Sequence, residues 1–200
     1  MSLAAPDLSS LTPGARRVLD AASTLFYERG IHAVGVDTIA ELAGVTKKTL
    51  YDRFGSKEAL VIAYLQHRDA RWREHLDACL AAAPPEGSER VLTVFDAALS
   101  WSDANSPKGC SAINARAELG DGADGRAVLL EVQRQTAWLL DLFTELCASA
   151  GLREPQQTAQ AMMLLYEGAI VTVGMATFPA PFVTARACAA TLLESARGDA

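Results

Sequence analysis

The sequence predicts an all-α protein of about nine helices, with a three-helix N-terminal head and a six-helix C-terminal body. Apolar residues recur every three to four positions along most of the 200 residues, and no stretch of any length shows the alternation typical of strands. Capping and helix-ending residues punctuate this pattern. Because half of the residues are hydrophobic, the chain can bury a substantial core.

The head is expected to contain three helices. The first begins at Pro13 after the capping residue Thr12, and Gly30 ends it. Gly44 ends the second, and Thr46 can cap the third. The expected ranges are residues 13–29, 36–43 and 47–54.

The body is expected to contain six further helices. Ser56 can cap the first of them, and Pro84 ends it. We therefore predict a helix-turn-helix domain over residues 12–56 and a ligand-binding and dimerisation domain over 57–200. The expected helices of the body are 57–83, 88–102, 110–118, 126–150, 155–177 and 181–196.

Composition excludes several classes of protein. No apolar run reaches the roughly 18 residues of a membrane-spanning helix, and "MSLAAPDLSS" lacks the pattern of a signal peptide, so we expect a cytoplasmic protein with no membrane partner. The four cysteines and three histidines show no ligand spacing. We expect free thiols, no metal and no cofactor.

Charge is distributed unevenly along the chain. Residues 1–75 hold ten Lys and Arg against nine Asp and Glu, whereas residues 76–200 hold eight against fifteen. Residues 46–57 contain four basic residues and one acidic residue, Asp52, which gives a local charge of +3. The net charge of -6 therefore does not exclude a polyanionic partner of this segment.

The two short helices, joined by the tight turn "AGV", have the size and turn chemistry of a helix-turn-helix. In that motif the N-terminal turn of the second helix enters the major groove, where its backbone N–H groups and lysines can meet phosphates and guanines. A solvated face with capping threonines is the alternative for any single residue. The DNA-contacting candidates are Thr38, Thr46, Lys47, Lys48, Thr49, Tyr51 and Lys57.

The segment "GVDTIAELAGVTKKTLYDRFGSKEAL" resembles the DNA-binding head of the TetR/AcrR family of bacterial transcription regulators, a resemblance that covers residues 12–65. It implies an all-helical fold, a ligand-binding body, and a dimer in which the last two helices of each subunit form a four-helix bundle. The same seven candidates match its DNA-contacting positions. Gly35 departs from the family's frequent Ser or Thr cap, and Asp52 with Arg53 replaces residues that are frequently neutral. We expect Asp52 to pair with Arg53 or another base.

Bulky apolar residues in the body can line a ligand pocket of the mainly apolar kind. Ordinary bundle core is the alternative for each of them. Asn114 and Gln135 interrupt apolar stripes, and a buried amide needs a partner, either a backbone carbonyl or a ligand. The pocket candidates are Phe95, Trp101, Asn114, Gln135, Trp138, Met162 and Tyr166.

Cys110 is a possible thiol sensor. It opens an expected helix and lies two positions after Lys108, and both a helix N-terminus and a nearby cation favour the thiolate. A small cysteine packed in the core is the alternative.

Together these observations predict a DNA-binding transcriptional regulator, a homodimer through the last two helices that acts on a pseudo-palindromic double-stranded operator and is released by a small-molecule effector. Repression is the expected action; activation, or electrophile sensing through Cys110, is the alternative. A helical small-molecule-binding protein or enzyme is a remote alternative, because no catalytic constellation is found. Nonspecific DNA compaction is disfavoured by the acidic body.

Overall fold

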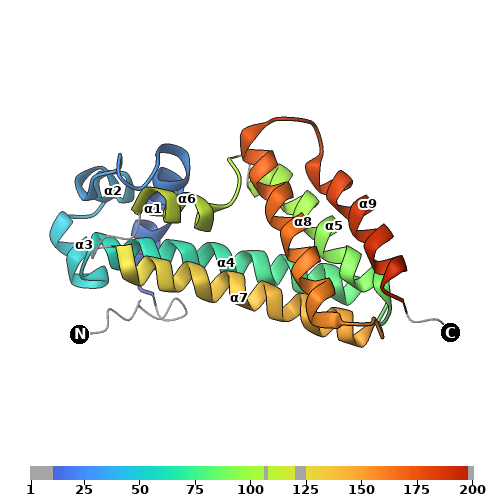
Figure 1. Ribbon diagram of the computed structural model, residues 1–200. Helices are drawn as coiled ribbons and strands as arrows, with labels where there is room; N and C mark the ends of the chain where they lie inside the picture. The colour runs from blue at the N-terminus through green and yellow to red at the C-terminus, as the bar shows by residue number, and fades with distance from the viewer. Residues whose placement is uncertain (1–10, 106–107, 120–124, 198–200) are drawn as a thin grey trace. The chain divides into compact units, whose positions relative to one another are not determined.

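The structure is a computed structural model that describes residues 11–105, 108–119 and 125–197. Within these ranges the chain forms nine α-helices and no β-strand (Figure 1), which confirms the expected fold class. The helices are α1 (Pro13–Arg29), α2 (Val36–Ala43), α3 (Lys47–Phe54), α4 (Lys57–Ala82), α5 (Ser88–Asn105), α6 (Ser111–Leu119), α7 (Arg126–Ser149), α8 (Pro155–Met175) and α9 (Pro181–Ser195).

Local sequence chemistry sets most helix boundaries, and α1, α2 and α3 have the expected bounds. The larger differences occur where no glycine or proline marks an end. Helix α5 continues to Asn105, three residues past the expected end at 102. Helix α8 ends at Met175 because Ala176 adopts a left-handed conformation, with φ of 51°.

The chain divides into two compact units. Among the described residues, the head unit comprises 11–70, 111–119 and 125–134, and the body unit comprises 71–105, 108–110 and 135–197. Helix α6 thus groups with α1–α3, although it lies beyond the expected boundary at residue 56. The expected boundary at residue 56 separates a DNA-binding function from a ligand-binding one, and it stays a prediction.

The core of the head unit follows the helical periodicity of its sequence. Leu50 and Phe54 of α3 are buried, as expected, and α3 contacts both α1 and α2. Arg17 of α1 donates from Nε to the carbonyl oxygen of Ala43 at 3.1 Å, which satisfies a carbonyl at the C-terminal end of α2. The other buried residues of these helices are Ala15, Val18, Leu19, Ala21, Ala22, Leu25, Phe26, Ile39, Ala40 and Ala43.

In the body unit, α9 packs against both α5 and α8. Aromatic side chains fill its interior, with Phe95, Phe143 and Phe182 fully buried. Across the described ranges no helix is long and apolar enough to cross a membrane. The N-terminal segment on which we based the absence of a signal peptide, residues 1–10, lies outside the described residues.

Candidate nucleic-acid interface

The turn between α2 and α3 is held by two specific residues. Gly44 ends α2 in the left-handed conformation, with φ of 62°, which glycine adopts without a steric cost. Thr46 then caps α3, because its Oγ1 accepts from the backbone N–H of Thr49 at 3.1 Å. The hydroxyls of Thr46 and Thr49 also lie 2.9 Å apart. The first turn of α3 is therefore fixed before any ligand arrives.

The two lysines of this turn are exposed, and each has an acidic partner. Lys47 Nζ lies 3.0 Å from both carboxylate oxygens of Asp37 at the start of α2. Lys48 Nζ lies 2.8 Å from Asp52 Oδ2, one turn along α3. The hydrogen bond to Asp52, together with the charge of that carboxylate, raises the pKa of Lys48. Asp52 thus pairs with another base, as expected, and this base is Lys48.

Two further candidates are exposed on the same pair of helices. Thr38 lies in the first turn of α2, and Tyr51 lies one turn after Lys47 on α3 with 41% of its surface exposed. Gly35 gives α2 no side-chain cap. The first turn of α2 therefore keeps backbone N–H groups that a side chain does not satisfy.

Lys57 has a different environment. It begins α4 and is half-buried, and its Nζ lies 6.0 Å from the centroid of the Phe26 ring. Burial lowers its pKa, and the nearby carboxylate of Glu118 partly offsets this shift. Lys57 also lines a cavity of about 350 Å³ together with Ile31, His32, Ser56, Glu58, Val61 and Leu119.

Glu118 of α6 is a residue that the sequence analysis missed. Its Oε2 accepts from the backbone N–H of His32 at 2.9 Å, so it holds the loop between α1 and α2. A Cβ on Gly30 would lie 3.1 Å from the same oxygen. The contact joins residues 86 positions apart, and no sequence spacing could have indicated it.

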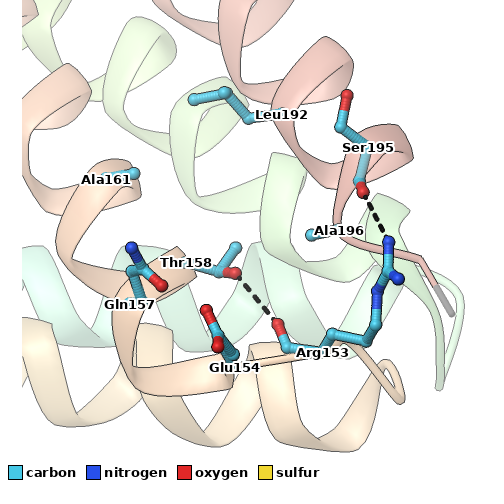
Figure 2. A pocket seen from close by; sticks show the side chains of 8 residues that line it. All are labelled: Arg153, Glu154, Gln157, Thr158, Ala161, Leu192, Ser195 and Ala196. Atoms are coloured by element: carbon cyan, nitrogen blue, oxygen red, sulfur yellow. Dashed lines mark hydrogen bonds between the residues drawn. The ribbon is translucent and has the colours of Figure 1, made fainter.

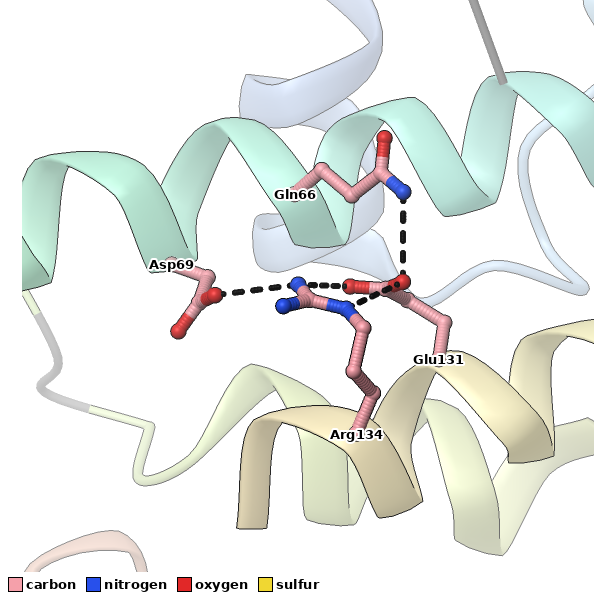
Figure 3. A network of polar contacts seen from close by, with 4 residues as sticks. All are labelled: Gln66, Asp69, Glu131 and Arg134. Atoms are coloured by element: carbon pink, nitrogen blue, oxygen red, sulfur yellow. Dashed lines mark hydrogen bonds and ion pairs between the residues drawn. The ribbon is translucent and has the colours of Figure 1, made fainter. Parts of the chain in front are cut away.

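A second polar cluster in the head unit joins α4 to α7 (Figure 3). Arg134 donates to both carboxylate oxygens of buried Glu131, at 2.7 and 3.0 Å. Gln66 donates to Glu131 at 3.1 Å, and Arg134 also lies 3.2 Å from Asp69. Gln66 and Asp69 lie three positions apart on α4, and Glu131 and Arg134 lie three positions apart on α7. These spacings are visible in the sequence, but only the fold brings the two helices together.

Three of the seven pocket candidates meet in an aromatic cluster of the body unit. The Phe95 and Tyr166 rings lie 6.4 Å apart, and Trp72 contacts both Trp101, at 5.9 Å, and Tyr166, at 6.3 Å. His75 joins this cluster and bonds through Nε2 to Ser100 at 2.9 Å. Its position one turn after Trp72 was the only sequence signal for it.

The other four candidates lie in different surroundings. Met162 is fully buried, and the Trp138 ring packs 3.7 Å from the guanidinium carbon of Arg73. Gln135 is half-exposed. Asn114 is exposed on α6 in the head unit, so the expectation that it is a buried amide on an apolar stripe is wrong. The buried positions of this helix are Ala112 and Ala115, and Asn114 lies outside the side of the helix that they define.

A groove of about 540 Å³ lies at the start of α8 and the end of α9 (Figure 2). Arg153 closes one side by donating to the carbonyl oxygen of Ser195 at 3.3 Å, and Thr158 donates to the carbonyl oxygen of Arg153 at 3.4 Å. None of the pocket candidates lines this groove. Its walls are Arg153, Glu154, Gln157, Thr158, Ala161, Leu192, Ser195 and Ala196.

Cys110 lies just before α6, which begins at Ser111, and its side chain is half-buried. Its sensor role stays a prediction. Within the described ranges no three His, Cys, Asp or Glu side chains are arranged to hold a metal ion.

Residues 18–64 match the family model described as bacterial regulatory proteins of the tetR family. The chain is 28% identical over 162 residues to the uncharacterised helix-turn-helix transcriptional regulator Rv1255c of Mycobacterium tuberculosis, covering 72% of this chain and 80% of that protein. Over 50 residues it is 52% identical to the transcriptional activator FasR of Mycolicibacterium smegmatis, covering 25% and 23% of the two chains.

The fold is similar to that of solved structures over nearly its whole length. The TetR-family transcriptional regulator SCO4454 from Streptomyces coelicolor superposes with a TM-score of 0.80 at 29% identity, covering 93% of this chain and 97% of that one. The reduced form of NemR from E. coli gives a TM-score of 0.74 at 22% identity, covering 90% and 97%, and shows the fold alone.

Proposed function

Because this chain belongs to the TetR family and is a DNA-binding transcriptional regulator, we propose that it acts as a homodimeric repressor. In this proposal the dimer binds a pseudo-palindromic operator through the first turns of α3, and a small molecule bound in the body unit releases it. Since the relatives are named as transcriptional regulators, we assign the chain no catalytic role. A regulator of bacterial DNA acts in the cytoplasm, where we place this protein.

The observation that carries the proposal is the first turn of α3. Thr46, Lys47 and Lys48 are exposed there, and the Thr46 cap fixes the turn that presents them. A fixed N-terminal turn suits insertion into the major groove, because its donors need no reordering on binding. Thr38 and Tyr51 flank this turn as contacts to the DNA backbone.

A dimer through α8 and α9 is supported by the apolar residues that these helices expose. Leu164 is 75% and Met175 72% exposed on α8, and Val171 lies on the same side of the helix. On α9, small residues such as Ala187 and Thr191 are exposed together with Val183. Small residues let helices approach closely, and an apolar surface of this extent favours burial against a second copy.

The aromatic cluster around Tyr166 supports an effector with aromatic or other apolar surface. Trp72, Trp101 and His75 are only partly covered, so their rings keep surface that a ligand can contact. Release from DNA requires that the effector bind the conformation that does not fit the operator more tightly than the conformation that does. An effector with equal affinity for the two conformations would shift no equilibrium.

Two of the relatives show why the sign of regulation needs its own test. The chain resembles FasR, named an activator, over 50 residues, and KstR2 of Rhodococcus jostii, named a repressor, over 57 residues. We propose repression, since a dimer that occupies promoter DNA blocks polymerase without further contacts. A reporter driven by the selected operator is expected to rise when the protein is removed.

The function is tested by selecting duplexes from a random pool and measuring affinity for the selected site with Lys48→Ala. The expected result is a pseudo-palindromic site with half-sites about 34 Å apart or a multiple of this spacing. We expect Lys48→Ala to weaken binding by about 1–3 kcal/mol while the dimer persists. Arg126→Ala, at the start of α7, is the control for loss of one exposed positive charge. Failure to enrich any sequence would contradict the proposal.

A further inference from the structure

We propose that Asp37 and Asp52 determine DNA specificity by competing with phosphates for Lys47 and Lys48. This inference rests on the proposed function and adds two residues that weaken binding to DNA of the wrong sequence. They act on the same two lysines that we assign to DNA contact.

Each lysine at the start of α3 has its own carboxylate. Lys47 Nζ is 3.0 Å from both oxygens of Asp37, which links α3 to the first turn of α2. Lys48 Nζ is 2.8 Å from Asp52, which lies on α3 itself. Both carboxylates are more than half exposed, so they share the surface that DNA would approach.

The charges of α2 and α3 also cancel in number. From Val36 to Phe54 the acidic residues are Asp37, Glu41 and Asp52, and the basic residues are Lys47, Lys48 and Arg53, a net charge of zero. The surplus of +3 over residues 46–57 included Lys57, which is half-buried beside Phe26, and left out both Asp37 and Glu41. Nonspecific DNA binding is almost wholly electrostatic, so a lysine that is held by its own carboxylate contributes less to the binding of random sequence than an unpaired lysine does.

Phosphates and bases place different demands on these pairs. A phosphate that takes the Lys48 ammonium comes close to the Asp52 carboxylate, and the two anions repel each other. Guanine O6 and N7 are neutral acceptors, and the ammonium has three donors, so it can bond guanine and keep its carboxylate. The carboxylates therefore penalise contacts to phosphate more than contacts to the correct base.

The test compares Asp52→Asn and Asp37→Asn with the wild type on two duplexes, the selected operator and a random sequence, over a range of salt concentrations. Each variant is expected to bind random duplex about tenfold more tightly and the operator at most about threefold more tightly. The salt dependence on random duplex should steepen by about one phosphate for each substitution. The inference would be overturned if the variants gained affinity equally for both duplexes, or gained no affinity for either.

Glu41→Gln is the matched control. Glu41 is exposed on α2 and forms no ion pair with the described residues, so this change removes the same charge without freeing a lysine. It should alter affinity for either duplex less than twofold. If Glu41→Gln reproduces the effect of Asp52→Asn, net charge alone is responsible, and the inference is wrong.

A double variant tests whether Asp52 acts through Lys48. In a Lys48→Ala background, Asp52→Asn should no longer tighten binding to random duplex; full persistence of its effect would contradict the mechanism.

Circular dichroism checks that each variant is folded, as expected for exposed side chains. If the wild type binds no selected sequence, the proposed function fails, whereas an unchanged ratio of the two affinities in the aspartate variants removes only this inference.

Discussion

Arg134 holds the buried carboxylate of Glu131 with two hydrogen bonds, of 2.7 and 3.0 Å, from one guanidinium group. Glu131 is only 7% exposed, and Arg134 reaches Asp69 as well. The hydrogen bond to Glu131 raises the pKa of Arg134 above its ordinary value. Arg134 therefore pairs with two carboxylates, one on α4 and one on α7.

Replacing Arg134 with Met is expected to destabilise the protein by about 3–5 kcal/mol, because it leaves Glu131 charged and without its cation. Chemical denaturation measures this change. The double variant Glu131→Met with Arg134→Met should recover much of the loss, since it removes the buried charge too. A loss of equal size in the double variant would show that packing, and not charge, decides stability here.

Glu118→Ala should loosen the loop between α1 and α2, because the N–H of His32 loses its acceptor. Hydrogen exchange at His32 is expected to accelerate by about tenfold, equivalent to about 1.4 kcal/mol of local stability. Glu118→Gln is the matched control, since its amide oxygen can still accept. Unchanged exchange in the alanine variant would show that the carboxylate does not hold this loop.

Gly30→Ala should destabilise the protein by about 1–3 kcal/mol, because φ of 88° is strained for alanine. The new Cβ would also lie 3.1 Å from Glu118 Oε2. Gly14→Ala serves as the control: it lies in α1 with open space around it and should stabilise by about 0.4–1 kcal/mol. Thermal melts of the two variants should therefore shift in opposite directions.

Leu164→Glu should dissociate the proposed dimer, because it introduces a charge into the apolar face of α8. Light scattering coupled to size exclusion measures the mass. Leu130→Glu on α7 places the same charge at a leucine that is 60% exposed in the head unit, and it should leave the mass unchanged. A Leu164→Glu protein that keeps the mass of a dimer would exclude this face as the interface.

Glu167 of α8 provides a test by pH. Burial raises its pKa, so the folded protein holds the charged form less readily than the unfolded chain does. The charge therefore costs stability above the folded pKa, and this cost disappears as pH falls below the unfolded value. Glu167→Gln should raise the melting temperature at pH 8 and have no effect near pH 3. Glu145→Gln, at an exposed position of α7, should show no such difference.

Much of the fold was predictable because its signals are local. The bounds of α1, α2 and α3 follow from caps such as Thr46 and from breakers such as Gly44, which act within one turn of the chain. The inward positions of Leu50 and Phe54 follow from helical periodicity alone. The helix-turn-helix and its candidate residues were visible for the same reason.

Asn114 shows the limit of periodicity. Its spacing fitted an apolar stripe of α6, yet the helix buries Ala112 and Ala115 and leaves the amide exposed. A nine-residue helix carries too few positions for periodicity to decide which side is covered. Which side of α6 is buried depends on the elements that pack against it, and these are set by the tertiary structure.

By itself, the sequence determined the helices, the capped turn before α3 and the excess of basic residues over 46–57, since each depends on neighbours a few positions apart. Only the tertiary structure decided three contacts. Asp37 pairs with Lys47, the ammonium of Lys57 lies near the Phe26 ring, and Glu118 accepts a hydrogen bond from the backbone of His32. Those contacts join different helices or the loops between them, and their distances are set by packing, which the spacing of residues along the chain does not record.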